Sequence, residues 1–221
     1  MNSDFKTFIL EATGAEKFQE LEVIQSLWSG YGKIIRIALK GGQQKTAILK
    51  YISFPIKTKH PRGWNSDVSH QRKVKSYEVE RSFYEYYGNK QIDARIPNCL
   101  GVIVKAEETL LVLEDLDGSG YPVRKTDVVW SELASCLQWL ANFHAGYMQI
   151  SPKNLWEIGT YWHLSTRPEE LEVLEDIPLK NAAPKLDASL NNARYQTIVH
   201  GDAKLANFCF SKTDNQVAAV D

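Results

Sequence analysis

The C-terminal segment is the part of this sequence that most restricts how the chain can fold. Residues 200–207 read His-Gly-Asp-Ala-Lys-Leu-Ala-Asn, which is a pattern typical of a polar loop. Two apolar stretches follow at 208–210 and 217–220, and the polar residues between them predict a β-hairpin. Such a hairpin would carry the chain from Asn207 to a further carboxylate at Asp221. We therefore expect the loop and this second acidic position at the two ends of one hairpin.

Four side chains of this segment have chemistry to offer. Asp202 could accept or orient the proton of an attacking hydroxyl, and Lys204 could neutralise charge on a phosphoryl group in transit. Asn207 and Asp221 are hard oxygen ligands, suited to Mg²⁺ that bridges phosphate oxygens. The alternative is an ordinary loop in which the Asp and Asn side chains cap turns. This segment alone leaves both interpretations open.

The composition excludes several classes of protein. The chain has 221 residues, 43% hydrophobic and 24% charged, which is typical of a globular protein with a sizeable core. A formal net charge of -1 argues against a nucleic-acid partner, which would favour a basic excess. The three widely spaced cysteines suggest neither a zinc site nor a disulfide framework, and the N-terminus lacks a signal-peptide pattern. Since no apolar stretch could span a bilayer, we expect a cytoplasmic protein without a membrane partner.

The first part of the chain predicts a helix followed by antiparallel strands. Residues 4–11 place Phe5, Phe8 and Ile9 on one face of a short helix, which would pack against a sheet. The apolar stretches that predict strands lie at residues 24–28, 33–39 and 46–52.

A glycine-rich turn separates the first two of these strands. Gly30, Tyr31 and Gly32 could let backbone N–H groups approach an anion without obstruction by side chains, and they are predicted nucleotide contacts. The alternative is a simple hairpin turn.

Lys50 lies inside the third apolar strand, where a buried cation is costly unless it is paired. A lysine that snorkels from an edge strand is the alternative. A helix is predicted from Val68 to about Tyr87, and it carries Glu78 and Glu80 on different faces. Either glutamate could be an ordinary surface residue, and one of them could be the partner of the lysine.

The residues between strand and helix are unusually basic. Segment 53–75 combines Pro and Gly with six Lys or Arg side chains and a single Asp. It could be a solvated excursion of the chain, or a basic flap near phosphates or near an acidic substrate. Six charges in an otherwise balanced chain do not predict a nucleic-acid surface.

A second pair of apolar strands, 100–104 and 109–113, runs into a linker rich in Gly and Asp. At such a hinge an adenine could hydrogen-bond to exposed backbone groups. Glu114 and Leu116 are the predicted contacts, with Leu116 as an apolar wall. Because main chain would make most of this contact, the sequence supports it through position alone.

The chain beyond the linker predicts helices. The clearest of them is amphipathic, and its apolar face consists of Trp130, Leu133, Ala134, Leu137, Leu140, Ala141 and His144. We interpret His144 as a hydrogen-bonded core histidine and not as a metal ligand. Further helices are predicted at 168–175 and 183–193, and a short strand at 197–199.

The order of these features resembles that of one superfamily. A glycine turn, a strand lysine, a helix glutamate, a hinge, a long helix and a His-x-Asp-x-Lys-x-x-Asn loop each appear once, in sequence. Its His-Gly-Asp, in place of His-Arg-Asp, resembles the aminoglycoside phosphotransferase and choline kinase superfamily. The segments similar to its ecdysteroid-kinase-like branch and the bacterial relatives of that branch are 27–32 (Leu-Trp-Ser-Gly-Tyr-Gly), 76–84 (Ser-Tyr-Glu-Val-Glu-Arg-Ser-Phe-Tyr) and 113–116 (Leu-Glu-Asp-Leu).

This resemblance implies an α+β, two-lobed protein-kinase-like fold. It implies a nucleotide-binding lobe at 1–116 and a partial, mainly helical catalytic lobe at 117–221. It also implies ATP and Mg²⁺ as cofactors, Lys50 paired with Glu80, and phosphate transfer to a small-molecule hydroxyl. A catalytically inactive nucleotide-binding or interaction module is the alternative. Relatives continue past the aspartate with helices that complete the acceptor pocket, so we expect either a fragment or a protein without that pocket.

Overall fold

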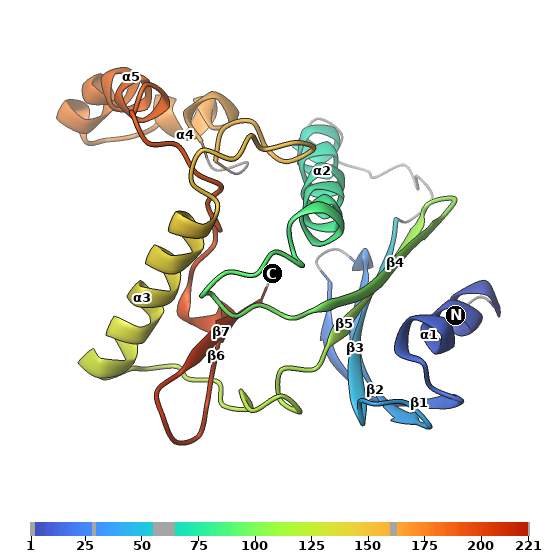
Figure 1. Cartoon of the computed structure of the whole chain (residues 1–221). Helices are drawn as coiled ribbons and strands as arrows, with labels where there is room; N and C mark the ends of the chain where they lie inside the picture. Colours follow the sequence, from blue (N-terminus) through green and yellow to red (C-terminus); the bar gives the residue numbers. More distant parts are fainter. Residues whose placement is uncertain (1–2, 28–29, 55–64, 160–162, 221) are drawn as a thin grey trace.

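A computed structural model describes residues 3–27, 30–54, 65–159 and 163–220. In the helix that begins at residue 65, the side chains are described from residue 70 onward. Asp221, a predicted metal ligand, and residues 55–64 of the basic segment lie outside the described residues. An N-terminal sheet and a mainly helical C-terminal half lie side by side (Figure 1). The predicted α+β fold class is confirmed.

Five strands form one antiparallel sheet in the order β1-β2-β3-β5-β4. They are β1 (Lys17–Ser26), β2 (Gly32–Lys40), β3 (Thr46–Ser53), β4 (Cys99–Lys105) and β5 (Glu108–Glu114). The helix α2 (Asn65–Tyr86) follows β3 and leads to the edge strand β4. The next strand, β5, then returns between β4 and β3, so the hinge leaves from the strand beside the edge strand β4.

Different helices cover the two faces of the sheet (Figure 1). On one face, α1 (Ser3–Thr13) buries Phe5 and Ile9 completely. They pack against Ile35, Ile37, Ala47, Leu49, Leu110 and Val112. On the other face, Tyr84 of α2 packs with Leu27, Ile52, Leu111 and Leu113. Because side chains alternate along a strand, Lys50 points to the α2 face while its neighbour Leu49 points to the α1 face.

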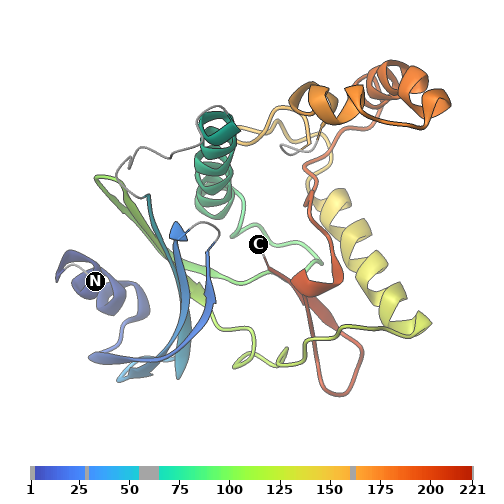
Figure 2. The same ribbon diagram turned by 180° about the vertical axis from the view of Figure 1, so that it is seen from behind.

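The C-terminal half is built around a small hairpin. Its elements are α3 (Trp130–Gly146), α4 (Pro168–Glu172), α5 (Ile177–Asn191), β6 (Phe208–Phe210) and β7 (Val217–Ala219), with single 3-10 turns at Leu164–Thr166 and Leu205–Asn207. The predicted hairpin is confirmed, and α3 packs on it through Trp139 and Phe143. Figure 2 shows α4 and α5 beyond one end of α3, away from the sheet. Among the described helices, none is long and apolar enough to cross a membrane.

The first strand differs from its prediction. The strand predicted at 24–28 spans Lys17–Ser26 in the structure. It is an edge strand that is exposed along most of its length, and two register shifts against β2 interrupt its pairing. Its apolar residues do not alternate regularly along the strand, which is why its start was not predicted.

The buried face of α3 also differs from its prediction. Cys136, Trp139 and Phe143 are buried, whereas Trp130 and Leu137 are 74% and 50% exposed. This helix is apolar on two faces, and periodicity alone does not decide which of them meets the core.

Two smaller predictions near the C-terminus differ from the structure. Segment 197–199 is not a strand, and side-chain contacts hold it in place: the hydroxyl of Thr197 donates to the carbonyl of His144 at 2.6 Å, and Ile198 packs into the core. The helix predicted at 183–193 begins earlier, at Ile177, where the side chain of Asp176 caps it.

Candidate active site

Lys50 and Glu80 form an ion pair between the sheet and α2. The Nζ of Lys50 donates to Oε1 of Glu80 at 2.6 Å. Their side chains are 7% and 14% exposed, and Nζ also lies 5.9 Å from the centre of the Tyr77 ring. A desolvated charge without a partner costs several kcal/mol, so each member needs the other. The strand lysine and the helix glutamate therefore form one unit.

The structure distinguishes the two glutamates that the sequence left as candidates. The side chain of Glu78 is 52% exposed on another face of α2, where Lys75 Nζ lies 3.8 Å away. Glu80 is the glutamate that reaches Lys50, as the resemblance implied. Its predicted role toward a nucleotide stays a prediction.

Tyr31 anchors the glycine turn to α2. It is 7% exposed, and its hydroxyl lies 2.6 Å from Nδ1 of His70. Phe54 and Tyr77 complete an aromatic cluster, with ring centroids 5.7 and 6.5 Å from that of Tyr31. The turn is thus fixed to the same helix that supplies Glu80.

The two glycines of the turn meet different backbone demands. Gly32 has a φ of 139°, and a Cβ there would lie 1.9 Å from the carbonyl oxygen of Tyr51 on β3. Gly30 has a φ of 73°, and its N–H donates to the carbonyl of Leu27 at 3.1 Å. Close packing between β2 and β3 explains Gly32 without a ligand. Anion binding by this turn stays a prediction.

The carboxylate of Glu114 makes hydrogen bonds that hold the hinge in place. Oε1 accepts hydrogen bonds from Arg95 and, at 2.5 Å, from the hydroxyl of Ser119, while Oε2 accepts the N–H of Asn98 at 3.0 Å. Burial would raise the pKa of Glu114, but these donors outweigh it and hold the pKa below its ordinary value. A nucleotide contact at Glu114 would therefore come from its main chain and not from its side chain.

Leu116 presents a backbone donor at the hinge. It is 3% exposed, and its carbonyl accepts the N–H groups of Ser119 and Tyr121 at 3.1 and 2.9 Å. No hydrogen bond runs from its own N–H to another described residue. Such a donor suits a ring nitrogen of an adenine. The cavity beside this turn, lined by parts of 117–122 and 211–216, contains none of the predicted site residues.

Asp202, Lys204 and Asn207 are brought together in the loop before β6. The Nδ2 of Asn207 donates to Oδ2 of Asp202 at 3.1 Å and to its carbonyl oxygen at 2.9 Å. The Nζ of Lys204 donates to the same Oδ2 at 2.6 Å. Asn207 is 7% exposed, whereas the side chains of Lys204 and Asp202 are 58% and 52% exposed. The loop therefore holds an accessible carboxylate with a buried amide.

The same loop offers an oxygen to a cation. The amide oxygen of Asn207 takes part in neither of those bonds, and it is the atom that a hard cation would bind. The N–H of Val220 donates to the carbonyl of Asn207 at 2.9 Å, so the end of the hairpin returns to the loop as predicted. Whether Asp221 completes the site stays a prediction, since it lies outside the described residues.

Sequence reasoning missed three residues that hold these parts in place, namely Arg36, His70 and Arg95. Arg36 had a usable signal, because it is a cation within the apolar stretch Ile-Ile-Arg-Ile-Ala. That is the pattern that singled out Lys50. The partners of His70 and Arg95 lie far away in the sequence, and no local pattern points to them.

The parts of this site define a class of protein. A five-stranded antiparallel sheet, a strand lysine paired with a helix glutamate, and an Asp/Asn loop before a small hairpin together make a kinase-like fold. The profile of the ecdysteroid kinase-like family matches residues 31–155, more than half of the chain. The chain belongs to that family. The matched segment includes Lys50 and Glu80, and the loop of Asp202 lies beyond it.

A comparison with solved structures gives a more distant likeness. The autoinhibited serine kinase domain of the giant muscle protein titin is similar over 62% of this chain, with 16% sequence identity and a TM-score of 0.33. This chain spans 39% of the length of that kinase domain. None of the curated proteins matches the chain.

Proposed function

We propose that the protein transfers the γ-phosphate of ATP to a hydroxyl group of a small-molecule acceptor. The observation that carries this proposal is the contact of 2.6 Å between Lys50 and Glu80. A strand lysine held by a helix glutamate is what kinase-type sites use to orient the phosphates of the nucleotide. Membership of the ecdysteroid kinase-like family supports the same class of reaction.

Asp202 is the base in this proposal. Its carboxylate accepts the proton of the attacking hydroxyl while that oxygen bonds to the γ-phosphorus, and the bond to the β-phosphate oxygen breaks to release ADP. Asn207 fixes the carboxylate through its Nδ2, 3.1 Å away. The Nζ of Lys204 donates to the same carboxylate oxygen, and at this position its ammonium can neutralise charge on the phosphoryl group. The half-exposed side chain of Asp202 is accessible to a substrate.

The nucleotide would contact residues from both halves of the chain. The N–H of Leu116 would donate to the adenine, with the main chain of Glu114 beside it. Lys50 and the turn at 30–32 would bind the phosphates. Asn207, through its amide oxygen, and Asp221 would hold Mg²⁺, which when bound neutralises charge on the phosphate oxygens.

Asp202→Asn tests the proposed roles. The variant keeps the size of the side chain but removes the base, so phosphate transfer is expected to stop while MgATP still binds in calorimetry. Asp93→Asn is the matched control, because it changes an exposed aspartate in the segment before β4, and it should keep both properties. Equal ATP consumption by Asp202→Asn and wild type, with a true acceptor present, would exclude Asp202 as the base.

The same titrations separate an enzyme from an inactive module. Wild-type protein is screened for ADP formation over a panel of alcohols and sterols after MgATP binding has been measured. Binding with turnover on one of these acceptors supports the proposal. Binding without turnover on any acceptor would favour a nucleotide-binding module, and absence of MgATP binding would contradict both.

A further inference from the structure

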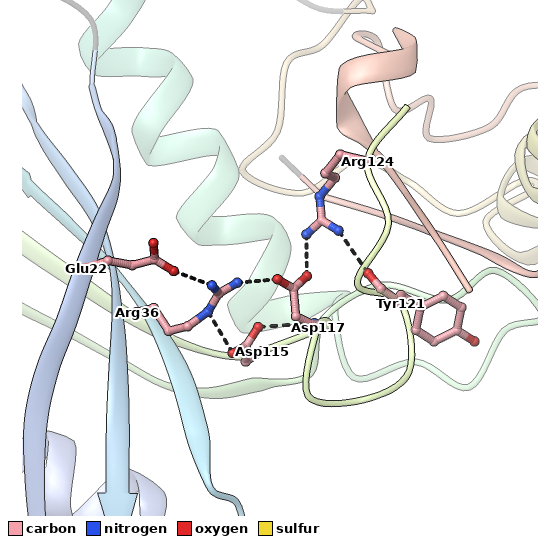
Figure 3. Close-up of polar contacts among 6 residues, drawn as sticks. All are labelled: Glu22, Arg36, Asp115, Asp117, Tyr121 and Arg124. Atoms are coloured by element: carbon pink, nitrogen blue, oxygen red, sulfur yellow. Dashed lines mark hydrogen bonds and ion pairs between the residues drawn. The ribbon is translucent and has the colours of Figure 1, made fainter. Parts of the chain in front are cut away.

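Arg36 contacts three carboxylates, one from β1 and two from the hinge (Figure 3). Its Nε donates to Oδ2 of Asp115 at 3.0 Å, and its Nη2 donates to Oδ2 of Asp117 at 2.5 Å. Its Nη1 donates to Glu22, which lies opposite Arg36 in the pairing of β1 with β2. Each nitrogen of the guanidinium group therefore has its own carboxylate. The guanidinium group presents its donors in a fixed planar fork, whereas an ammonium group is a compact point charge at the end of a flexible stem.

The cluster is partly buried and is not an ordinary surface pair. The side chains of Arg36 and Asp115 are 20% and 5% exposed. Burial would lower the pKa of Arg36, but the charges of Asp115, Asp117 and Glu22 outweigh it and raise the pKa. The second oxygen of Asp115 accepts the N–H of Asp117 at 3.1 Å, so the same carboxylate also shapes the start of the hinge turn. These interactions are screened less than exposed ones.

Arg124 extends the cluster into the second half of the chain. Its Nη2 donates to Oδ1 of Asp117 at 2.8 Å, and its Nη1 donates to the carbonyl of Tyr121 at 2.9 Å (Figure 3). Asp117 is thus shared by two arginines, one in the sheet and one in the segment that leads to α3. A continuous chain of charged contacts runs from β1 across the hinge.

The position of Arg36 connects this cluster to the glycine turn. Arg36 and Gly32 lie on the same strand, β2, whose first residue is Gly32. Arg36 pairs with Ile48 of β3 across the ladder, so the two side chains lie on the same face of the sheet. Side chains alternate along a strand, so Lys50, two residues after Ile48, lies on that face as well. The cluster therefore attaches β2, the strand that follows the glycine turn, to the hinge at 115–117.

We propose that Arg36 is a positioning residue that fixes β1 and β2 over the hinge and so sets the affinity for the adenine end of the nucleotide. This inference rests on the proposed function, because it takes Leu116 as the adenine contact. Phe83 of α2 and Tyr87, the residue after the helix, pack into the core of the C-terminal half. Arg36 connects the halves at a different place, through the two strands farthest from β4.

Calorimetric titrations with ATP, ADP and AMP test this proposal. Arg36→Ala is expected to weaken binding of all three by the same factor, about tenfold or about 1.4 kcal/mol, because the cluster acts at the adenine end they share. Arg36→Lys keeps the charge but not the fork, and it should lie between Arg36→Ala and wild type. Loss of ATP affinity alone would contradict the proposal and assign Arg36 to the phosphates. Unchanged affinity for all three nucleotides would also overturn it.

Lys33→Ala is the matched control. Lys33 and Glu20 join the same two strands through an exposed pair, 3.9 Å apart, that does not include the hinge. Its removal should leave all three affinities unchanged. Circular dichroism at the titration temperature shows whether each variant is folded. If Arg36→Ala does not fold, Asp117→Asn is used instead, since it removes the partner shared by the two arginines while Asp115 stays paired.

Amide hydrogen exchange gives a second readout that needs no nucleotide. Residues 115–121 and β2 should exchange faster in Arg36→Ala than in wild type or Lys33→Ala. Equal exchange in the three proteins would overturn the proposal even if wild type bound no nucleotide. Absence of binding by wild type would contradict the proposed function separately.

Discussion

The hydroxyl of Tyr31 lies 2.6 Å from Nδ1 of His70, and this contact joins the glycine turn to α2. The same helix carries Glu80, which pairs with Lys50 on β3. The turn, the strand lysine and the helix glutamate are thus held relative to one another by two side-chain contacts. A movement of α2 relative to the sheet would break both contacts.

Removal of the tyrosine hydroxyl should measure the first of these contacts. Tyr31→Phe keeps the aromatic packing and loses one hydrogen bond in a buried position, so we expect a loss of about 1 kcal/mol in the free energy of unfolding. Urea unfolding measures this loss. Tyr86→Phe is the control, since Tyr86 is 59% exposed and should lose much less. Equal losses in the two variants would show that the contact with His70 does not stabilise the protein.

Removal of the strand lysine should lower the free energy of unfolding more than removal of the tyrosine hydroxyl does. Lys50→Met leaves the carboxylate of Glu80 without its ammonium partner, and breaking a buried pair in this way costs about 3 kcal/mol. The double variant Lys50→Met/Glu80→Leu should recover much of that stability, because no buried charge is left unpaired. Urea unfolding of the variants measures both effects.

The exposed pair of Lys75 and Glu78 provides the control for Lys50. Lys75→Met removes one member of a solvent-screened pair, and the expected change is at most about 0.5 kcal/mol. A cost for Lys50→Met no greater than that for Lys75→Met would contradict the view that Lys50 and Glu80 are a structural unit.

Glu114 should make stability depend on pH in the acid range. Its pKa lies below the ordinary value of 4.5 in the folded protein, so the unfolded chain binds a proton first as the pH falls. The stability that Glu114 contributes is therefore complete above pH 4.5 and is lost as the pH falls through the folded pKa. Glu114→Gln should be less stable than wild type near neutral pH, and the difference should shrink below pH 4.5.

Thermal unfolding over a pH series measures this difference. Glu78→Gln serves as the reference, since the side chain of Glu78 is 52% exposed and makes no comparable set of hydrogen bonds among the described residues. A difference between wild type and Glu114→Gln that stayed constant at all pH values would exclude the assigned pKa shift as its cause.

Several parts of the fold could be predicted because burial leaves a pattern in the sequence. The strands β2, β3, β4 and β5 are apolar on at least one face, and their predicted positions agree with the structure within a few residues. The strand β1 is exposed, so hydrophobicity did not show where it begins. The two apolar faces of α3 gave no means of choosing between Trp130 and Trp139 as the buried residue.

The candidate site was likewise predictable only in part. Lys50 could be identified because a cation in an apolar strand needs a partner. Arg36 carries the same signal, but its three partners come from β1 and the hinge, and only the tertiary arrangement brings them together. The carboxylate of Glu114 was predicted to lie at the hinge, and the contacts with Arg95 and Ser119 that occupy it depend on how the hinge folds back.

The central claim is that Asp202 serves as the base of an ATP-dependent phosphotransferase. The most direct measurement follows the γ-phosphate of MgATP by ³¹P NMR with pooled hydroxyl acceptors, for wild type and for Asp202→Asn. We predict that the γ-phosphate signal of wild-type samples decreases while a phosphate monoester appears, and that Asp202→Asn samples keep their ATP although they still bind it. A γ-phosphate signal that decreased equally in both, or in neither, would contradict the claim.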